Sequence, residues 1–306
     1  MTEAVVTEEV VTEASEAELV RARLGERRIP GIIDIHTHFM PPQVMRKVWA
    51  YFDSAGPLTG RPWPITYRGD EADRLARLRS FGVRRFTSLC YPHKAGMAQW
   101  LNEWTADFAD RHPDCVRSGT FFPEPEAAEY ARVAVENGVR VFKAHVQVGG
   151  YDPNDPLLDP VWELLVEREL PVVIHGGDGP APGRHTGVVH MRRLLERHPD
   201  LTLVVAHMGL PEYGAFLDLC ADHPRVHLDT TMAFTAFTEE VDPFPRDRLG
   251  DLAALEDRIL FGSDFPNIPY AYLEALDAVL GLGLGADWER AVLHDNAARL
   301  LGGTVT

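Results

Sequence analysis

Two histidines stand one residue apart near the start of the chain, in the stretch DIHTHF at residues 34–39. Because alternate side chains of a β-strand point to the same face, a strand here places His36 and His38 side by side. Two neutral imidazoles fill a core poorly but form half of a metal site. The chain has 13 histidines, so composition alone can produce this spacing. Its meaning depends on which other residues point to the same place.

Polar residues also close several apolar runs further along the chain. Lys143, His175 and His207 follow one another at steps of 32 residues, a regularity that a random scatter would not keep. Left unpaired among apolar neighbours, such groups each cost roughly 2 to 7 kcal/mol, and one bound cation satisfies several of them together. The polar residues at strand ends are His36, His38, Lys143, His145, His175, His207, Asp229 and Asp264.

The elements that must position these residues alternate along the chain from residue 29 onward. Residues 158–169, for example, show a helical pattern with Asp159 as the cap and Pro160 in the first turn. Eight strands at intervals of about 30 residues, separated by helices, predict an α/β fold of the (β/α)8 TIM-barrel type. A doubly wound open sheet is disfavoured because no glycine-rich phosphate turn follows the first strand. The predicted strands are 31–36, 85–89, 117–121, 139–144, 171–175, 201–206, 225–229 and 258–262.

Three similar corners set the direction of the predicted barrel. RHPD at 111–114, RHPD at 197–200 and DHPR at 222–225 each stand between a helical pattern and a strand. Proline ends a helix, and a histidine there complements the negative end of the helix dipole. Barrel active sites lie at the opposite, carboxyl ends of the strands. The histidines thus predicted to lie outside the site are His112, His198 and His223, together with His190 and His294 in helical patterns.

The bulk composition sets the class of protein. A chain of 306 residues with 45% hydrophobic and 25% charged residues is long enough for one barrel domain over residues 29–306. Residues 1–28 form an acidic tail, predicted to be partly disordered or a short helix. The net charge of −16 argues against nucleic acid or an anionic membrane as partner. Without a signal sequence, a membrane span or a disulfide framework among its three cysteines, the protein is expected in the cytoplasm.

The polar residues and their surroundings resemble the amidohydrolase superfamily, in particular the amidohydrolase-related branch that includes aminocarboxymuconate semialdehyde decarboxylase and several lactone hydrolases. The likeness covers about residues 29–302. The phrases that carry it are DIHTH at 34–38, FKAH at 142–145, IHGG at 174–177, AHMG at 206–209, FGSDFP at 261–266 and DNAARLLG at 295–302.

The resemblance implies a divalent metal, most often zinc, with manganese or iron as alternatives. It implies His36, His38, His175 and Asp264 as the ligands. Three imidazoles and a carboxylate suit zinc by their own chemistry as well. The resemblance also implies that Asp264 takes a proton from the attacking water. His207 would then polarise the substrate carbonyl or stabilise the oxyanion.

Lys143 has three interpretations. In binuclear members of the superfamily a lysine of the fourth strand is carboxylated and bridges two metals. Here it is followed by Ala144 and His145, as in the amidohydrolase-related branch, which favours one metal and an ammonium group that binds a substrate carboxylate. A plain salt bridge to Asp229 or Asp34 is the third interpretation.

Two segments are expected to line a pocket for a small molecule. Residues 39–69 form a long insertion rich in aromatic residues, and Gly176–Gly187 carries Asp178, Arg184 and His185. His145 and Arg184 are candidate substrate-binding residues. The pocket is expected to suit a cyclic or aromatic, carboxylated compound.

The predicted function is metal-dependent hydrolysis of a C–N or C–O bond. The alternatives are a non-oxidative decarboxylase of the same fold and, least favoured, a non-catalytic ligand-binding barrel. The identity of the substrate, the number of metals and the oligomeric state, including a homo-oligomer, stay open.

Overall fold

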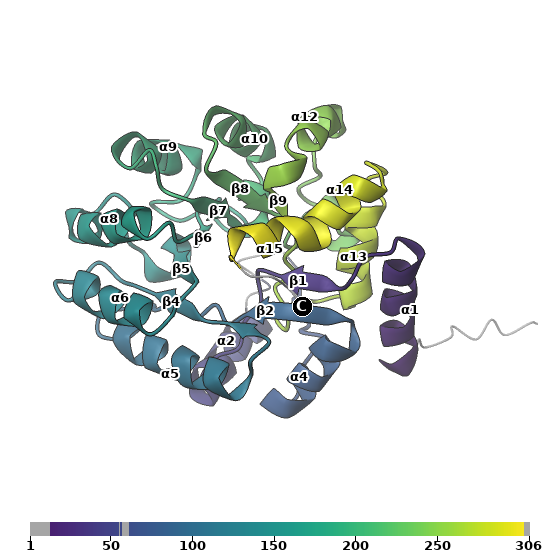
Figure 1. The fold of residues 1–306 in the computed structure, drawn as a ribbon, viewed down its shortest axis with the longest axis horizontal. Coiled ribbons are helices and arrows are strands. Elements are labelled where there is room, and N and C mark those ends of the chain that lie inside the picture. The colour runs from purple at the N-terminus through teal and green to yellow at the C-terminus, as the bar shows by residue number, and fades with distance from the viewer. Residues whose placement is uncertain (1–12, 55, 57–60, 303–306) are drawn as a thin grey trace, which may run out of the picture.

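The computed structural model describes residues 13–54, 56 and 61–302. In Figure 1 the strands form the centre of the molecule and the helices surround them. All strand pairs are parallel. The strands are β1 (Ile32–Asp34), β2 (Val83–Thr87), β3 (Cys115–Val116), β4 (Ser118–Thr120), β5 (Val141–His145), β6 (Val172–His175), β7 (Leu203–Val205), β8 (Val226–Asp229) and β9 (Ile259–Leu260).

Helices follow the strands around the outside of the barrel. The longer ones are α1 (Glu13–Glu26), α2 (Pro42–Ser54), α4 (Glu71–Ser80), α5 (Ala98–Arg111), α6 (Ala127–Glu136), α8 (Asp159–Glu167), α9 (Val188–Arg197), α10 (Tyr213–Asp222) and α13 (Tyr272–Leu280). The shorter ones are α7 (Val146–Gly149), α11 (Ala236–Glu239), α12 (Leu249–Ala254), α14 (Ala286–Arg290) and α15 (Asn296–Leu300). Single turns are η1 (Pro156–Leu158), η2 (Ala206–Gly209), η3 (Arg246–Arg248), η4 (Glu256–Arg258) and η5 (Ala291–Asp295).

The strands close into a ring in chain order. Ladders run from β1 to β3 and from β4 to β9. The third strand begins two residues before the predicted range of 117–121 and is interrupted at Arg117, so that β3 and β4 are its two halves. The first and last strands meet through backbone bonds from Ile35 N to Phe261 O (3.0 Å) and from Asp264 N to the carbonyl oxygen of His36 (2.8 Å). This topology confirms the predicted (β/α)8 TIM barrel.

The inside of the barrel is apolar at one end and polar at the other. One buried cluster includes Val141, Val173, Val204 and Leu260, one residue from each of four strands. Ala297 of α15 and Leu301 belong to the same cluster, so the C-terminal helix closes the amino ends of the strands. Since side chains alternate along a strand, the next inward positions toward the carboxyl ends are where the predicted polar residues stand.

The three histidines of the His-Pro corners lie at the ends of helices, as predicted. His112, His198 and His223 are the C-caps of α5, α9 and α10, each directly before a strand. The expected helix near residue 158 forms as α8, but Asp159 is not its cap. The carboxylate of Asp159 instead pairs with Arg197 at the end of α9, because the η1 turn runs directly into the helix.

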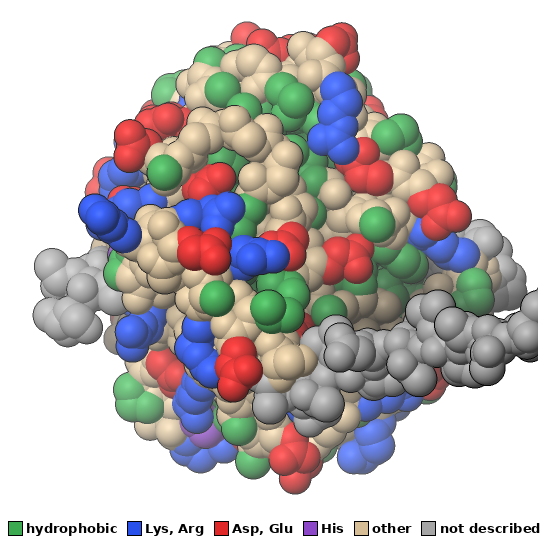
Figure 2. Space-filling view, turned by 90° about the vertical axis from the view of Figure 1, so that its right-hand side faces the viewer, with side chains coloured by type: hydrophobic (Ala, Val, Ile, Leu, Met, Phe, Trp, Pro, Cys, Tyr) green, Lys and Arg blue, Asp and Glu red, His purple; other side chains and the backbone are tan. Residues whose placement is uncertain are grey.

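The N-terminal helix α1 packs on the side of the barrel, beside α13 (Figure 1). Its Val20 is fully buried, and Glu16 accepts a hydrogen bond from the Tyr67 hydroxyl at 2.6 Å. On the face of the molecule that includes this helix, acidic and basic side chains are interspersed (Figure 2). The rest of the acidic tail, residues 1–12, lies outside the described residues. Among the described residues, no helix has both the length and the apolar character needed to cross a membrane.

Candidate metal and catalytic site

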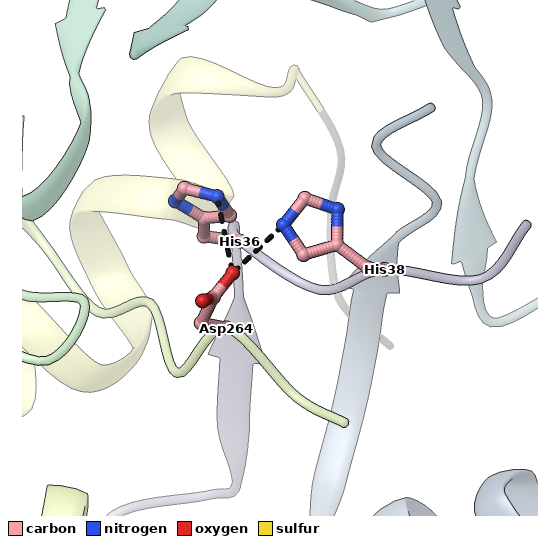
Figure 3. A group of neighbouring side chains, drawn as sticks. All are labelled: His36, His38 and Asp264. Atoms are coloured by element: carbon pink, nitrogen blue, oxygen red, sulfur yellow. Dashed lines mark ion pairs between the residues drawn. The ribbon is translucent and has the colours of Figure 1, made fainter. Parts of the chain in front are cut away.

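Three of the four predicted metal ligands come together at the carboxyl end of the barrel. His36 and His38 follow β1, and Asp264 follows β9. Figure 3 shows both imidazoles turned toward one carboxylate oxygen of Asp264. That oxygen, Oδ1, lies 2.8 Å from His38 Nε2 and 3.7 Å from His36 Nε2. All three side chains are nearly fully buried. One ligand atom from each residue lies within 4.8 Å of the others, so the group is compact enough for one metal ion.

Hydrogen bonds on the far side of each ring orient the imidazoles. His36 Nδ1 lies 2.8 Å from Asp229 Oδ2, and His38 Nδ1 lies 2.8 Å from the Leu89 carbonyl oxygen. With Nδ1 of each ring engaged by these acceptors, Nε2 is the ring atom that faces Asp264. A carboxylate or carbonyl behind a metal-binding histidine is the usual arrangement in metal sites.

Lys143 of β5 lies against the same group. It is fully buried, and its Nζ is 3.2 Å from His36 Nε2. No ion pair forms between Lys143 and Asp229 or Asp34, the partners of the salt-bridge interpretation. Burial lowers the pKa of Lys143 to about 8, against the opposing charges of Asp229 and Asp264. The negative charges of Asp229 and Asp264 therefore favour the ammonium form of Lys143, although neither carboxylate contacts it directly.

His145, His175 and His207 continue the polar wall as a chain of rings. His145 and His175 stack with centroids 4.1 Å apart, and His175 meets His207 at 4.8 Å. His207 lies 5.2 Å from His36, so the chain returns to the first pair. His175 Nε2 contacts the Gly179 carbonyl at 2.9 Å, and this residue is not part of the compact three-ligand group. Only its Nδ1 is free to face the site.

Burial sets the charge state of these rings. It is the largest factor lowering the pKa of His36, His145, His175 and His207. Four neutral imidazoles result, each with a lone pair that can bind a cation. Burial alone would raise the pKa of Asp264, but the hydrogen bond and charge of His38 outweigh it and leave the pKa at about 2. Asp264 is thus a carboxylate at neutral pH.

Asp34 holds the two ligand-bearing segments together from below. Its Oδ1 accepts from the backbone N–H of His36 (3.2 Å) and of Ser263 (3.1 Å), one next to each ligand segment. Its Oδ2 accepts from the hydroxyls of Ser263 (2.6 Å) and Tyr272 (2.9 Å). Burial raises the pKa of Asp34 to about 7. From the sequence, Asp34 was expected only as a candidate salt-bridge partner of Lys143.

The chain can approach the site here only because residue 262 is glycine. A Cβ on Gly262 would lie 2.2 Å from Thr231 Oγ1 and 2.7 Å from His36 Cβ. Two residues later Asp264 adopts φ +68°, a left-handed conformation that is uncommon for a residue other than glycine. Such strain is tolerated where the surroundings fix the conformation, and it occurs often at functional sites.

The two predicted pocket segments differ in what they contact. In the aromatic insertion, Trp49 and Trp63 donate from Nε1 to Asn267, at 3.0 Å to its side chain and 2.8 Å to its carbonyl. Asn267 stands three residues after Asp264, so the insertion packs directly on the ligand-bearing segment. Arg184, predicted to bind substrate, is exposed on the loop after β6. Residues 55 and 57–60 of the insertion lie outside the described residues.

Two polar groups have contacts at the site that the sequence did not predict. Tyr91, which follows the second strand, places its ring 4.6 Å from His145 and 5.6 Å from His38. Asp229 was recognised as a strand end but not as the partner of His36, which lies 193 positions away in the chain.

Comparisons with known proteins identify the family and the fold. A family model described as Amidohydrolase matches residues 33–303. No match was found among the curated protein sequences. A TIM-barrel protein from Bordetella bronchiseptica has a similar structure, with 21% identity, TM-score 0.69, and coverage of 89% of this chain and 98% of that one.

Two further solved structures are similar over most of their length. 5-Carboxyvanillate decarboxylase from Sphingomonas paucimobilis has 17% identity and TM-score 0.65, covering 90% of this chain and 100% of that one. A probable 2-pyrone-4,6-dicarboxylic acid hydrolase from Acinetobacter baumannii, with citric acid bound, has 14% identity and TM-score 0.60, covering 89% and 100%. At these identities the similarity shows the fold alone.

Proposed function

The chain belongs to the amidohydrolase family, and from that premise we propose that it is a metal-dependent hydrolase of a C–N or C–O bond. The proposed substrate is a small cyclic or aromatic compound that carries a carboxylate. The observation that supports this most directly is the convergence of His36, His38 and Asp264 at the carboxyl end of the barrel. We further propose that it acts as a cytoplasmic enzyme on a small molecule, without nucleic acid or membrane as partner.

The side chains present fit a divalent metal. His36 and His38 offer Nε2 lone pairs because their Nδ1 atoms are bonded elsewhere, and Asp264 offers a carboxylate oxygen. We propose His175, through its Nδ1, as a further ligand. Nitrogen and oxygen donors of this kind suit zinc first, with manganese or iron as alternatives. Such an ion acts as a Lewis acid that lowers the pKa of water toward neutrality.

The remaining roles belong to the side chains of this chain. Asp264 is ionised and can accept the proton of the attacking water. His207, whose backbone N–H donates to Asp229 at 2.9 Å, is held where its ring can stabilise developing negative charge on the substrate. The buried Lys143 ammonium is the group best suited to bind a substrate carboxylate.

The proposal is tested by metal content and activity together. Purified protein is expected to hold a divalent ion, measured by elemental analysis, and to hydrolyse at least one member of a panel of carboxylated lactones and cyclic amides. His36→Ala/His38→Ala is expected to lose the ion and the activity while remaining folded by circular dichroism, because these residues lie at the mouth and not in the packed layers. Wild-type protein that holds no metal and does not respond to added zinc or manganese would contradict the proposal.

Decarboxylation of an aromatic carboxylate is the second candidate. The observation that favours it is the buried Lys143 ammonium next to His36, which can hold a substrate carboxylate beside the metal ligands. A decarboxylase is also among the proteins of similar fold. Release of carbon dioxide from the same substrate panel, without uptake of water into the product, would decide for this candidate. Metal bound without turnover of any panel member would leave only a ligand-binding barrel.

A further inference from the structure

A second group of metal-binding side chains lies outside the site described above. Asp152 belongs to the loop after β5, His185 to the loop after β6, and His190 to the first turn of α9. Their ligand atoms all lie within 4.8 Å of one another. His185 Nδ1 is 3.8 Å from Asp152 Oδ2, and His190 Nδ1 is 4.0 Å from Asp152 Oδ1. The two rings are 5.7 Å apart and nearly perpendicular.

These separations are too long for hydrogen bonds between the three side chains. They are close to what a shared cation requires. Tetrahedral zinc with bonds of about 2.0 to 2.2 Å sets its ligand atoms roughly 3.4 Å apart. The separations between each histidine nitrogen and its nearest Asp152 oxygen exceed this spacing by only about half an ångström. A hydrogen-bonded arrangement would need the imidazoles to move further toward the carboxylate.

Asn154 preorganises the group from behind. This residue is almost fully buried. Its backbone N–H and its side-chain amide donate to Asp152 Oδ1 at 2.9 and 3.2 Å, and the same amide donates to the His190 carbonyl at 3.2 Å. Asp152 and His190 are thus held in a common frame by one buried side chain. Oriented ligands of this kind lower the cost of binding a metal.

We propose that Asp152, His185 and His190 form a second, peripheral site for a divalent transition metal such as Zn²⁺, with water completing the coordination. Two imidazoles and one carboxylate form a donor set that prefers zinc over magnesium or calcium. The site is separate from His36, His38 and Asp264 and does not depend on the proposed function. It is the only other such group among the residues that the structure describes.

A cation there would fasten the loop after β6 to the loop after β5. Residues 176–187 of that loop are anchored at the base by Gly187 N to Gly176 O (2.7 Å) and in the middle by Gly179 N to Leu210 O (2.8 Å). His185 lies between these anchors, in the part that has no such backbone bond. The carbonyl of Gly179 in the same loop contacts His175, so fixing the loop also fixes a wall of the candidate catalytic site.

The test counts Zn²⁺ in matched variants. The His36→Ala/His38→Ala protein serves as the parent, so that the candidate catalytic site does not contribute. Calorimetric titration with Zn²⁺ is expected to show one site in this parent and none after adding His185→Gln/His190→Gln. Adding His198→Gln instead is the control, because His198 also neighbours a carboxylate, Asp159 at 3.4 Å, but without a second histidine. It is expected to leave the site intact.

A second measurement reports the loop directly. Zn²⁺ at a hundredfold excess over its Kd is expected to slow amide hydrogen exchange in residues 176–187 by up to about 100-fold, since opening that breaks the site must first release the ion. Asp152→Asn keeps the shape of the side chain and is expected to abolish this protection. It serves as the test variant if the histidine variants do not fold. Equal Zn²⁺ stoichiometry in all variants, or protection that persists in Asp152→Asn, would overturn the proposal.

Discussion

Histidines occur at both ends of this barrel, and they differ in almost every physical respect. At the carboxyl ends of the strands, His36, His175 and their neighbours are buried and neutral, and their rings face one another. At the amino ends, His112, His198 and His223 cap helices and lie near acidic side chains or solvent. The same residue type thus serves helix termination at one end and a concentrated group of lone pairs at the other.

The difference shows what each end is built for. Helix-capping histidines contribute a fraction of a kcal/mol each and disturb nothing. The buried rings at the other end have lowered pKa values, which means that folding works against their protonation. Burying several imidazoles side by side therefore costs stability, and proteins accept such a cost at functional sites. The predictions below test this contrast, beginning with the largest expected effect.

Asp264→Asn is expected to have the largest effect. It keeps the shape of the side chain but removes both the anionic ligand and the proton acceptor. We expect turnover to fall at least ~10³-fold and the metal content to drop, since the two roles are lost together. Turnover on the panel substrate and elemental analysis provide the measurements. If Asp264→Asn retains both, the carboxyl end of the barrel is not the catalytic end.

His207→Asn is expected to lower turnover by a similar order, but for a different reason. We place this residue next to the substrate and outside the direct metal ligands of a one-metal site, so its loss should leave the metal content unchanged. Metal content is the deciding measurement. Release of an ion from His207→Asn would instead indicate two metals, with a carboxylated Lys143 as the bridge.

His227 tests whether burial alone, away from the carboxyl ends of the strands, makes stability depend on pH. It belongs to β8, near the amino end, yet burial lowers its pKa to about 4. The unfolded chain then binds the extra proton between pH 6.5 and 4. The free energy of unfolding is therefore undiminished above pH 6.5 and falls by at most about 3 kcal/mol as the pH drops to 4.

Urea unfolding at several pH values measures this contribution. In His227→Gln the acid loss of stability should be smaller than in the wild type, while the loss due to the carboxyl-end histidines remains. An identical pH profile for the two proteins would show that His227 is not the group responsible.

The smallest effects are expected at the amino ends. Replacing His112, His198 or His223 by Gln should change the free energy of unfolding by about 1 kcal/mol or less and leave turnover unchanged. Thermal unfolding and activity assays of the three variants provide the measurements. A large fall in turnover with metal retained would invert the assignment of the two ends.

The barrel was predictable because its signals are local and repeated. The strand period of about 30 residues and the three His-Pro corners are set by chain neighbours, and the structure follows both. The place of Lys143 and His175 on one wall also follows from strand alternation. The extent of β1 was not predictable in this way. The strand ends at Asp34, and backbone hydrogen bonds to the segment after the last strand hold His36 and His38 on the same face.

The features that sequence reasoning missed depend on pairs that are far apart in the chain. The partnership of Asp229 with His36 joins residues 193 positions apart, and no local pattern reveals it. His190 was set aside because its neighbours form a helical pattern, which is correct for α9 but says nothing of the loops that face its first turn. Side-chain direction, as in the contact of His175 Nε2 with Gly179, depends on loop conformation and not on residue order.

The closure of the ring by its first and last strands has a consequence for synthesis. Asp34 and Ser263, which join the two ligand-bearing segments, are 229 positions apart. At about 5 to 20 residues per second, a ribosome needs roughly 10 to 50 s to make the intervening chain. During that interval His36 and His38 are already made, but Asp264 does not yet exist. Until Asp264 is made, a nascent chain therefore lacks one of its four proposed ligands, and the proposed metal site is complete only after synthesis of the last strand.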